Sequence, residues 1–176
     1  MPLPKHYESL QKLDWMGIGF MIFGFSLCGI WLCFHGFPVF RKTFMVIMLV
    51  LMVSNIGFQM TPCYIKPECF CARTSFYVVT CLICLGLAVA WRFVCATDLE
   101  IRELSGLVEM AFVHLGIGFF FYMKKVPECI PYLRQYKFVQ LYLGSHGFWH
   151  IFVVANQYCM FWFVYKYNLM IEKALD

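Results

Sequence analysis

Two histidines one helical turn apart are the residues of this chain best suited to chemistry. His146 and His150 lie in the segment Ser-His-Gly-Phe-Trp-His that spans residues 145–150. An i, i+4 spacing places both imidazoles on one face of a helix, which is the arrangement used by two-histidine metal sites. The H-x3-H pattern is common without a metal, so a metal site competes here with two histidines that only pack or hydrogen-bond.

A carboxylate near the start of the chain can add to this pair. Asp14 begins the first apolar segment, and five membrane crossings would place it on the same side as the start of the fifth segment, which carries His146 and His150. Zinc accepts two imidazoles together with a carboxylate, or with a water molecule that the carboxylate holds. We therefore expect these three side chains to converge near the membrane interface on the inner side, where the first and fifth segments begin.

Three other ionisable residues lie inside apolar segments. Inserting such a residue at the bilayer centre costs roughly 2.5 to 3.5 kcal/mol of free energy, so each needs a partner or a task. Arg92 is near the end of the third segment and Glu109 near the start of the fourth. A helical hairpin would bring them to similar depth, so we expect an ion pair that clasps the two helices, with a proton or lipid site as the alternative. His114, midway along the fourth segment, is expected to be a hydrogen-bonded packing residue.

The elements that must position these residues are membrane-spanning helices. Hydrophobic residues make up 62% of the chain and charged residues 14%, against about 25% charged in soluble domains. Five segments approach the length of about 20 residues that crosses a bilayer, and they lie roughly at 15–36, 40–60, 75–97, 104–123 and 142–165. The predicted fold is an all-α polytopic bundle of five spans over residues 15–168, with polar ends at 1–14 and 169–176.

The basic residues predict an orientation for these spans. With five crossings, eight of the 14 Lys and Arg share the side of the N-terminus, namely Lys5, Lys12, Lys66, Arg73, Lys124, Lys125, Arg134 and Lys137. The positive-inside rule then places the N-terminus in the cytoplasm or the mitochondrial matrix. Because the positive charges are scattered between apolar segments, no nucleic-acid partner is expected, while membrane lipids are.

Three motifs resemble a known family when they are read in chain order. Residues 12–18, Lys-Leu-Asp-Trp-Met-Gly-Ile, resemble the third transmembrane helix of the progestin and adipoQ receptors, a family that includes the hemolysin III-like proteins. Gly118, Tyr122 and the run Lys-Val-Pro-Glu at 125–128 resemble the end of the sixth helix and the following loop. Residues 144–155 resemble the seventh helix.

The resemblance implies a seven-helix zinc protein, and zinc-dependent lipid amide hydrolysis is attributed to several members. His146 and His150 would inherit two zinc-ligand positions, and Asp14 the position that holds the metal-bound water. The family's third ligand is a histidine on its second helix. The first two helices have no counterpart in this chain, so we expect a shortened form with an incomplete zinc site.

Cysteines gather on the side of the N-terminus. Cys63, Cys69 and Cys71 share the loop after the second segment, and Cys129 is expected on the same side. The cluster could form a disulfide or a second metal site, but an inner, reducing compartment favours free thiols.

Two functions follow from these expectations. The first is a non-enzymatic accessory subunit of a larger membrane complex, for which an energy-transducing organelle membrane such as the mitochondrial inner membrane is the expected place. The alternative is a zinc-dependent lipid amide hydrolase, ceramidase-like, or a receptor of the family, in which another chain could supply the third zinc ligand.

Overall fold

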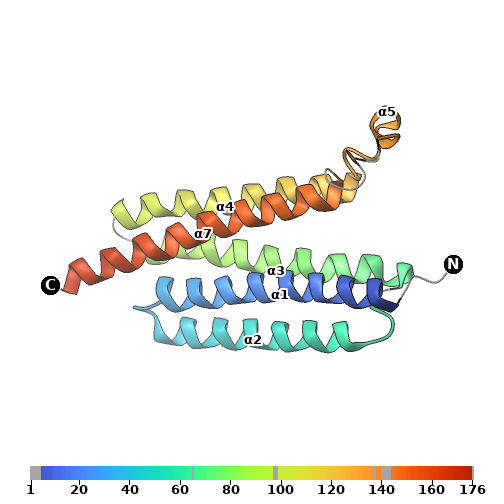
Figure 1. The fold of residues 1–176 in the computed structure, drawn as a ribbon. Helices are drawn as coiled ribbons and strands as arrows, with labels where there is room; N and C mark the ends of the chain where they lie inside the picture. Colours follow the sequence, from blue (N-terminus) through green and yellow to red (C-terminus); the bar gives the residue numbers. More distant parts are fainter. Residues whose placement is uncertain (1–4, 65, 97–98, 137, 140–143, 176) are drawn as a thin grey trace. The chain divides into compact units, whose positions relative to one another are not determined.

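The computed structural model describes residues 5–64, 66–96, 99–136, 138–139 and 144–175, and the regular structure within these ranges is helical (Figure 1). The elements in chain order are α1 (Lys5–Cys33), α2 (Pro38–Met60), the short helix η1 (Pro67–Cys69), α3 (Phe70–Ala90), the π-helical segment η2 (Trp91–Cys95), α4 (Leu99–Lys124), α5 (Pro131–Arg134) and α7 (Ser145–Leu175). They form two compact units, Met1–Ala96 and Thr97–Asp176.

The first unit contains the helices α1, α2 and α3. Proline at the first turn of α2 suits a helix start, because its missing N–H would have no partner there. The hairpin between α1 and α2 closes with the Phe34 and Phe44 rings 5.3 Å apart and with the Arg41 guanidinium 4.3 Å from the Trp31 ring. A hydrogen bond from the Tyr77 hydroxyl to the Trp15 carbonyl, 2.9 Å long, joins α3 to α1.

The second unit is built on the antiparallel pair α4 and α7, which lie side by side in Figure 1. Gly118 permits their close approach, since a Cβ at this position would lie 2.7 Å from the Phe152 Cβ. Phe121 stacks on Phe148 and Phe152, with ring centroids 5.2 and 5.7 Å apart. Further along, the Asn156 side chain donates a 2.8 Å hydrogen bond to the Ala111 carbonyl.

The helices agree with the predicted fold class. Within the described residues, four helical stretches are long and apolar enough to cross a membrane, at Ser9–Cys33, Pro38–Met60, Phe70–Val94 and Arg102–Lys124. They correspond to the first four predicted spans, although the first begins six residues and the third five residues earlier than expected. The chain is therefore a helical integral membrane protein.

The fifth predicted span, 142–165, corresponds to α7, but α7 is not among the four candidate spans. With 31 residues and about 1.5 Å of rise per residue, α7 is long enough to cross a bilayer. His146, His150, Asn156 and Gln157 lower its hydropathy. The fifth crossing stays a prediction, as do the division into one bundle with polar ends and the orientation. Lys137 and residues 142–143 lie outside the described residues.

Candidate metal centre

The turn that follows α4 determines how the chain approaches α7. The N–H of Lys125 bonds to the Tyr122 carbonyl and the N–H of Val126 to the Phe121 carbonyl, at 3.3 and 3.1 Å. These two bonds are those of a Schellman motif, and Lys125 occupies its left-handed position with φ of 50°. The helix therefore stops abruptly, and Glu128 follows three residues after the turn begins.

Glu128 holds the first residue of α7. Its Oε1 accepts hydrogen bonds from the Ser145 N–H at 2.7 Å and from the Ser145 hydroxyl at 3.1 Å. The first N–H groups of a helix have no partner within the helix and carry the positive end of its dipole. A carboxylate at this position therefore accepts their hydrogen bonds and neutralises part of that positive charge. This contact fixes the start of the helix that carries the two histidines.

His146 and His150 face one another on α7, as their spacing predicts. Their Nε2 atoms are 3.0 Å apart and their ring centroids 4.6 Å apart. His146 is exposed and His150 half-buried. At this distance one Nε2–H can donate to the other Nε2, or both nitrogens can direct a lone pair at one cation.

The spacing of the two nitrogens fits a zinc ion. Zn–N bonds are about 2.0 to 2.1 Å long, so an ion bound equally to two Nε2 atoms 3.0 Å apart would have an N–Zn–N angle of about 94°. A widening of roughly 0.3 Å would reach the tetrahedral angle. Small rotations of the two rings provide such a shift.

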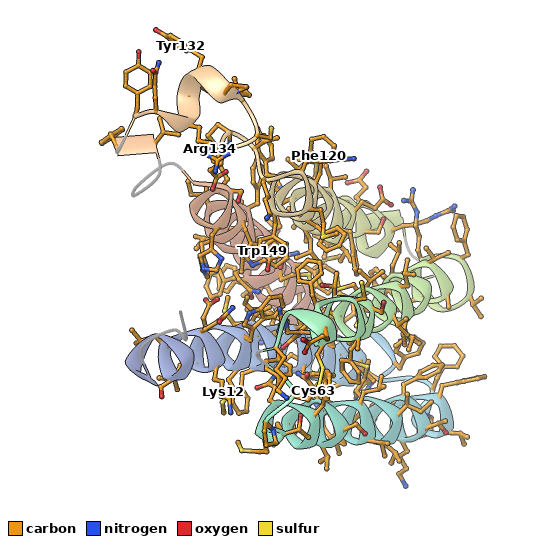
Figure 2. The ribbon with its side chains drawn as sticks, turned by 90° about the vertical axis from the view of Figure 1, so that its right-hand side faces the viewer. Lys12, Cys63, Phe120, Tyr132, Arg134 and Trp149 are labelled. Atoms are coloured by element: carbon orange, nitrogen blue, oxygen red, sulfur yellow. A yellow bond between two sulfur atoms is a disulfide. The ribbon has the colours of Figure 1, made fainter. Side chains whose placement is uncertain are left out.

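Aromatic rings of the second unit pack beside the turn of α7 that carries the histidine pair. The Tyr122 ring lies 6.3 Å from the His146 ring and 6.1 Å from the Trp149 ring. Figure 2 shows Trp149 among the side chains of α7 and Phe120 on α4. Phe119 also contacts Trp149, with ring centroids 6.5 Å apart. These contacts pack α4 against the turn of α7 that carries the pair, while His146 itself stays exposed.

Asp14 belongs to the first unit and lies on α1, where its side chain is half-buried. The following residue, Trp15, anchors this turn: its carbonyl accepts the Tyr77 hydroxyl, its ring lies 5.3 Å from the Tyr77 ring, and the Arg73 guanidinium lies 5.0 Å from it. The turn that carries the carboxylate is thus tied to α3.

Arg92 and Glu109 also belong to different units. Arg92 lies in η2, with its guanidinium 5.7 Å from the Phe93 ring, and Glu109 is exposed on α4. Their ion pair stays a prediction. His114 is hydrogen-bonded as expected, because its Nδ1 lies 2.7 Å from the Met110 carbonyl oxygen, and it is 4.0 Å from the Cys159 sulfur.

The loop cysteines differ from the prediction. Cys63 and Cys69 form a disulfide, whereas Cys71 and Cys129 are exposed free thiols. The expectation of free thiols is therefore wrong for Cys63 and Cys69. The turn between α2 and α3 explains the difference, since it brings their Cα atoms to 6.4 Å, within the usual range for disulfides.

Sequence reasoning missed the contact of Glu128 with Ser145. The run at 125–128 was recognised only as part of a family motif, and nothing in its residue types indicates which helix the carboxylate reaches. It also missed a polar cluster in the first unit, in which Asn55 and Gln59 each donate a hydrogen bond to the Tyr77 hydroxyl. The i, i+4 spacing of Asn55 and Gln59 in an apolar segment is a signal that could have revealed them.

Comparison with known proteins supports the resemblance that the motifs suggest. A family model described as haemolysin-III related matches residues 2–161, which is most of the chain. Neither the curated proteins nor the solved structures compared with the chain gave a match. The matched region includes Asp14, Glu128 and both histidines of α7. The chain belongs to the haemolysin-III related family.

Proposed function

We propose that this protein binds a zinc ion through the Nε2 atoms of His146 and His150, with the carboxylate of Asp14 as a further donor. The observation that carries the proposal is the 3.0 Å separation of the two Nε2 atoms at the start of α7. Together the three side chains offer two imidazole nitrogens and one carboxylate oxygen as ligand atoms. Zinc sites use this donor set.

The topology of the membrane spans supports the part given to Asp14. In a chain that crosses five times, the first and fifth helices begin on the same side, so Asp14 and the histidine pair would lie at the same interface. Asp14 would either bind the ion directly or orient a water molecule beside it. When bound, zinc would supply a Lewis acid that acidifies water, to a pKa of about 7 in catalytic sites.

We further propose that the chain is an accessory subunit of a larger membrane assembly. The family resemblance gives three zinc-binding histidine positions, of which His146 and His150 occupy two, so the zinc site within residues 1–176 is incomplete. The helices also present large apolar side chains that lipid or partner helices must cover, such as Val50 and Val53 of α2, exposed by 59 and 64%. An organelle membrane such as the mitochondrial inner membrane remains the expected place.

The alternative function is hydrolysis of a lipid amide. The observation that favours it is the exposure of His146 beside the half-buried His150, which leaves the pair open to a substrate. In this reading Asp14 would hold and deprotonate the attacking water, and the imidazoles would hold the metal. An accessory subunit would have no such activity.

Metal analysis of the purified protein tests the proposal. We expect about one zinc per chain or per complex in the wild type and a loss of more than about tenfold in affinity for the double variant His146→Ala/His150→Ala. His114→Ala is the matched control, because His114 lies on α4 and hydrogen-bonds to its own helix. Equal zinc retention by the double variant and the control would contradict the proposal.

Asp14→Asn separates the roles of the carboxylate. Loss of its charge should weaken zinc binding by about 10- to 100-fold, as changes around metal ligands commonly do. Unchanged affinity would exclude Asp14 from the site.

Hydrolysis of a ceramide-type amide by the wild type, abolished in Asp14→Asn, would decide for the enzyme. Copurification with other chains at fixed stoichiometry, with no hydrolysis, would decide for the subunit.

A further inference from the structure

Three polar side chains form a buried cluster in the first unit. Asn55 and Gln59 lie one turn apart on α2 and are each exposed by 2%, and Tyr77 on α3 is exposed by 8%. Polar groups in a membrane helix must find partners inside the protein, because lipid offers none. The hydrogen bonds of this cluster can therefore be counted group by group.

The single hydroxyl proton of Tyr77 determines how the two amides are oriented. Tyr77 donates this proton to the Trp15 carbonyl at 2.9 Å. The Tyr77 oxygen can then only accept, and it accepts N–H groups from Gln59 Nε2 at 3.0 Å and from Asn55 Nδ2 at 3.4 Å. Both amides thus direct their nitrogens at Tyr77, and their oxygens are directed elsewhere.

Two amide oxygens have no hydrogen-bond partner among the residues that the structure describes. They are Asn55 Oδ1 and Gln59 Oε1, and both are buried. Leaving two acceptors unsatisfied in this environment is costly, and the remedy that proteins use most often is a buried water molecule.

A cavity lies beside the same two amides. Asn55 and Gln59 line it together with Met16, Gly19 and Phe23 of α1 and Met52 of α2. The volume that the centre of a water molecule can occupy there is about 10 Å³. This volume is about the minimum that holds one water. Gly19 keeps the space between α1 and the amides open, since a Cβ there would lie 2.8 Å from Asn55 Nδ2.

We propose that this cavity binds one water molecule, which donates its two hydrogens to Asn55 Oδ1 and Gln59 Oε1. Water has the two donors that the two acceptors require and is small enough for the space. A lipid hydroxyl has a single O–H donor and would satisfy only one of the two acceptors. A metal cation would find only two neutral oxygens where Ca²⁺ takes six to eight and Mg²⁺ six.

The bound water would complete a hydrogen-bonded connection between three helices. It bridges the two amides of α2, the amides bond to Tyr77 of α3, and Tyr77 bonds to Trp15 of α1. Because Trp15 follows Asp14, the connection ends at the helical turn that carries this carboxylate. The water site stands on the contacts of the first unit alone and does not depend on zinc.

Hydroxyl-radical footprinting of the protein in lipid nanodiscs tests the site. X-ray radiolysis of a bound water oxidises the side chains beside it, so Met16 and Met52, which line the cavity, should be oxidised several-fold faster than Met45. Met45 is the matched control, since it is on α2, is half-buried like Met16 and Met52, and does not line the cavity. Oxidation of Met16 and Met52 no faster than that of Met45 would overturn the proposal.

A double variant that removes the acceptors confirms the assignment. In Asn55→Leu/Gln59→Leu the oxidation of Met16 and Met52 should fall several-fold toward that of Met45, while Met123 at the far end of α4, exposed by 41%, should be unaffected. Unchanged oxidation of Met16 and Met52 in the folded variant would contradict the site. If the variant does not fold, the comparison within the wild type still decides. Zinc content is measured in parallel, so that failure of the metal proposal is recognised separately.

Discussion

At the scale of single residues, the histidine pair and the glycine at position 118 show how local spacing becomes function. The i, i+4 spacing on a regular helix is sufficient to bring the Nε2 atoms of His146 and His150 to 3.0 Å. Gly118 acts on the same helix pair by allowing α4 to approach α7, whose residues Trp149 and Phe152 lie against it. The histidines supply the proposed ligand atoms, and the glycine allows the helix that carries them to pack closely.

Gly118→Ala should destabilise the α4–α7 pair. The added Cβ would lie 2.7 Å from the Phe152 Cβ and 3.2 Å from the Trp149 ring, so the helices must separate, at a cost of about 1–3 kcal/mol. Gly116→Ala is the control, because nothing lies within 4 Å of its added Cβ, and a helical Gly→Ala change favours the helix by up to about 1 kcal/mol. Thermal unfolding in one detergent compares them. An equally stable Gly118→Ala variant would show that the helices do not pack as described.

At the scale of elements, the ends of the helices decide where the site residues lie. The Schellman turn after α4 leads to Glu128, and Glu128 caps α7 through Ser145. The helix that carries the histidine pair is thus fixed by a residue 18 positions before the first histidine. In the first unit, a disulfide between Cys63 and Cys69 closes the turn between α2 and α3.

Glu128→Ala should destabilise the start of α7 by about 1–3 kcal/mol, since it removes a charged acceptor from the N–H and the hydroxyl of Ser145. Glu128→Gln keeps an acceptor oxygen and should lose less. Glu172→Ala is the control: this exposed residue accepts a hydrogen bond from Asn168 near the other end of α7, and its loss should cost within about 0.5 kcal/mol. Hydrogen exchange of the first amides of α7 reports the effect. Equal protection in Glu128→Ala and the wild type would refute the capping role.

Alkylation before and after reduction tests the disulfide. In the folded protein purified without reductant, Cys71 and Cys129 should react, whereas Cys63 and Cys69 should react only after reduction. Disulfides persist mainly in oxidising compartments, while the positive-inside rule places the same loop in the cytoplasm or matrix. Alkylation of all four thiols in the unreduced protein would exclude the disulfide and agree with the charge-based orientation.

At the scale of the whole molecule, the sequence was sufficient for what depends on composition and regular spacing. Apolar length predicted five spans, and four of them correspond to described helices that are long and apolar enough to cross a membrane. The i, i+4 rule predicted the geometry of His146 and His150. Contacts set by tertiary packing were not predictable, such as Glu128 reaching Ser145 and the two amides of α2 sharing the Tyr77 hydroxyl. A disulfide in the cysteine cluster was one of the possibilities, but free thiols were expected instead of the Cys63–Cys69 bond because the expected compartment, rather than the turn, governed the prediction.

X-ray absorption at the zinc edge of the purified protein tests the central claim most directly. Zinc held by His146, His150 and Asp14 should show a first shell of nitrogen and oxygen at about 2.0–2.2 Å with the outer scattering of two imidazoles, which the double variant His146→Ala/His150→Ala abolishes. A first shell of sulfur at about 2.3 Å, unaffected by that variant, would assign the metal to cysteines and contradict the proposed site.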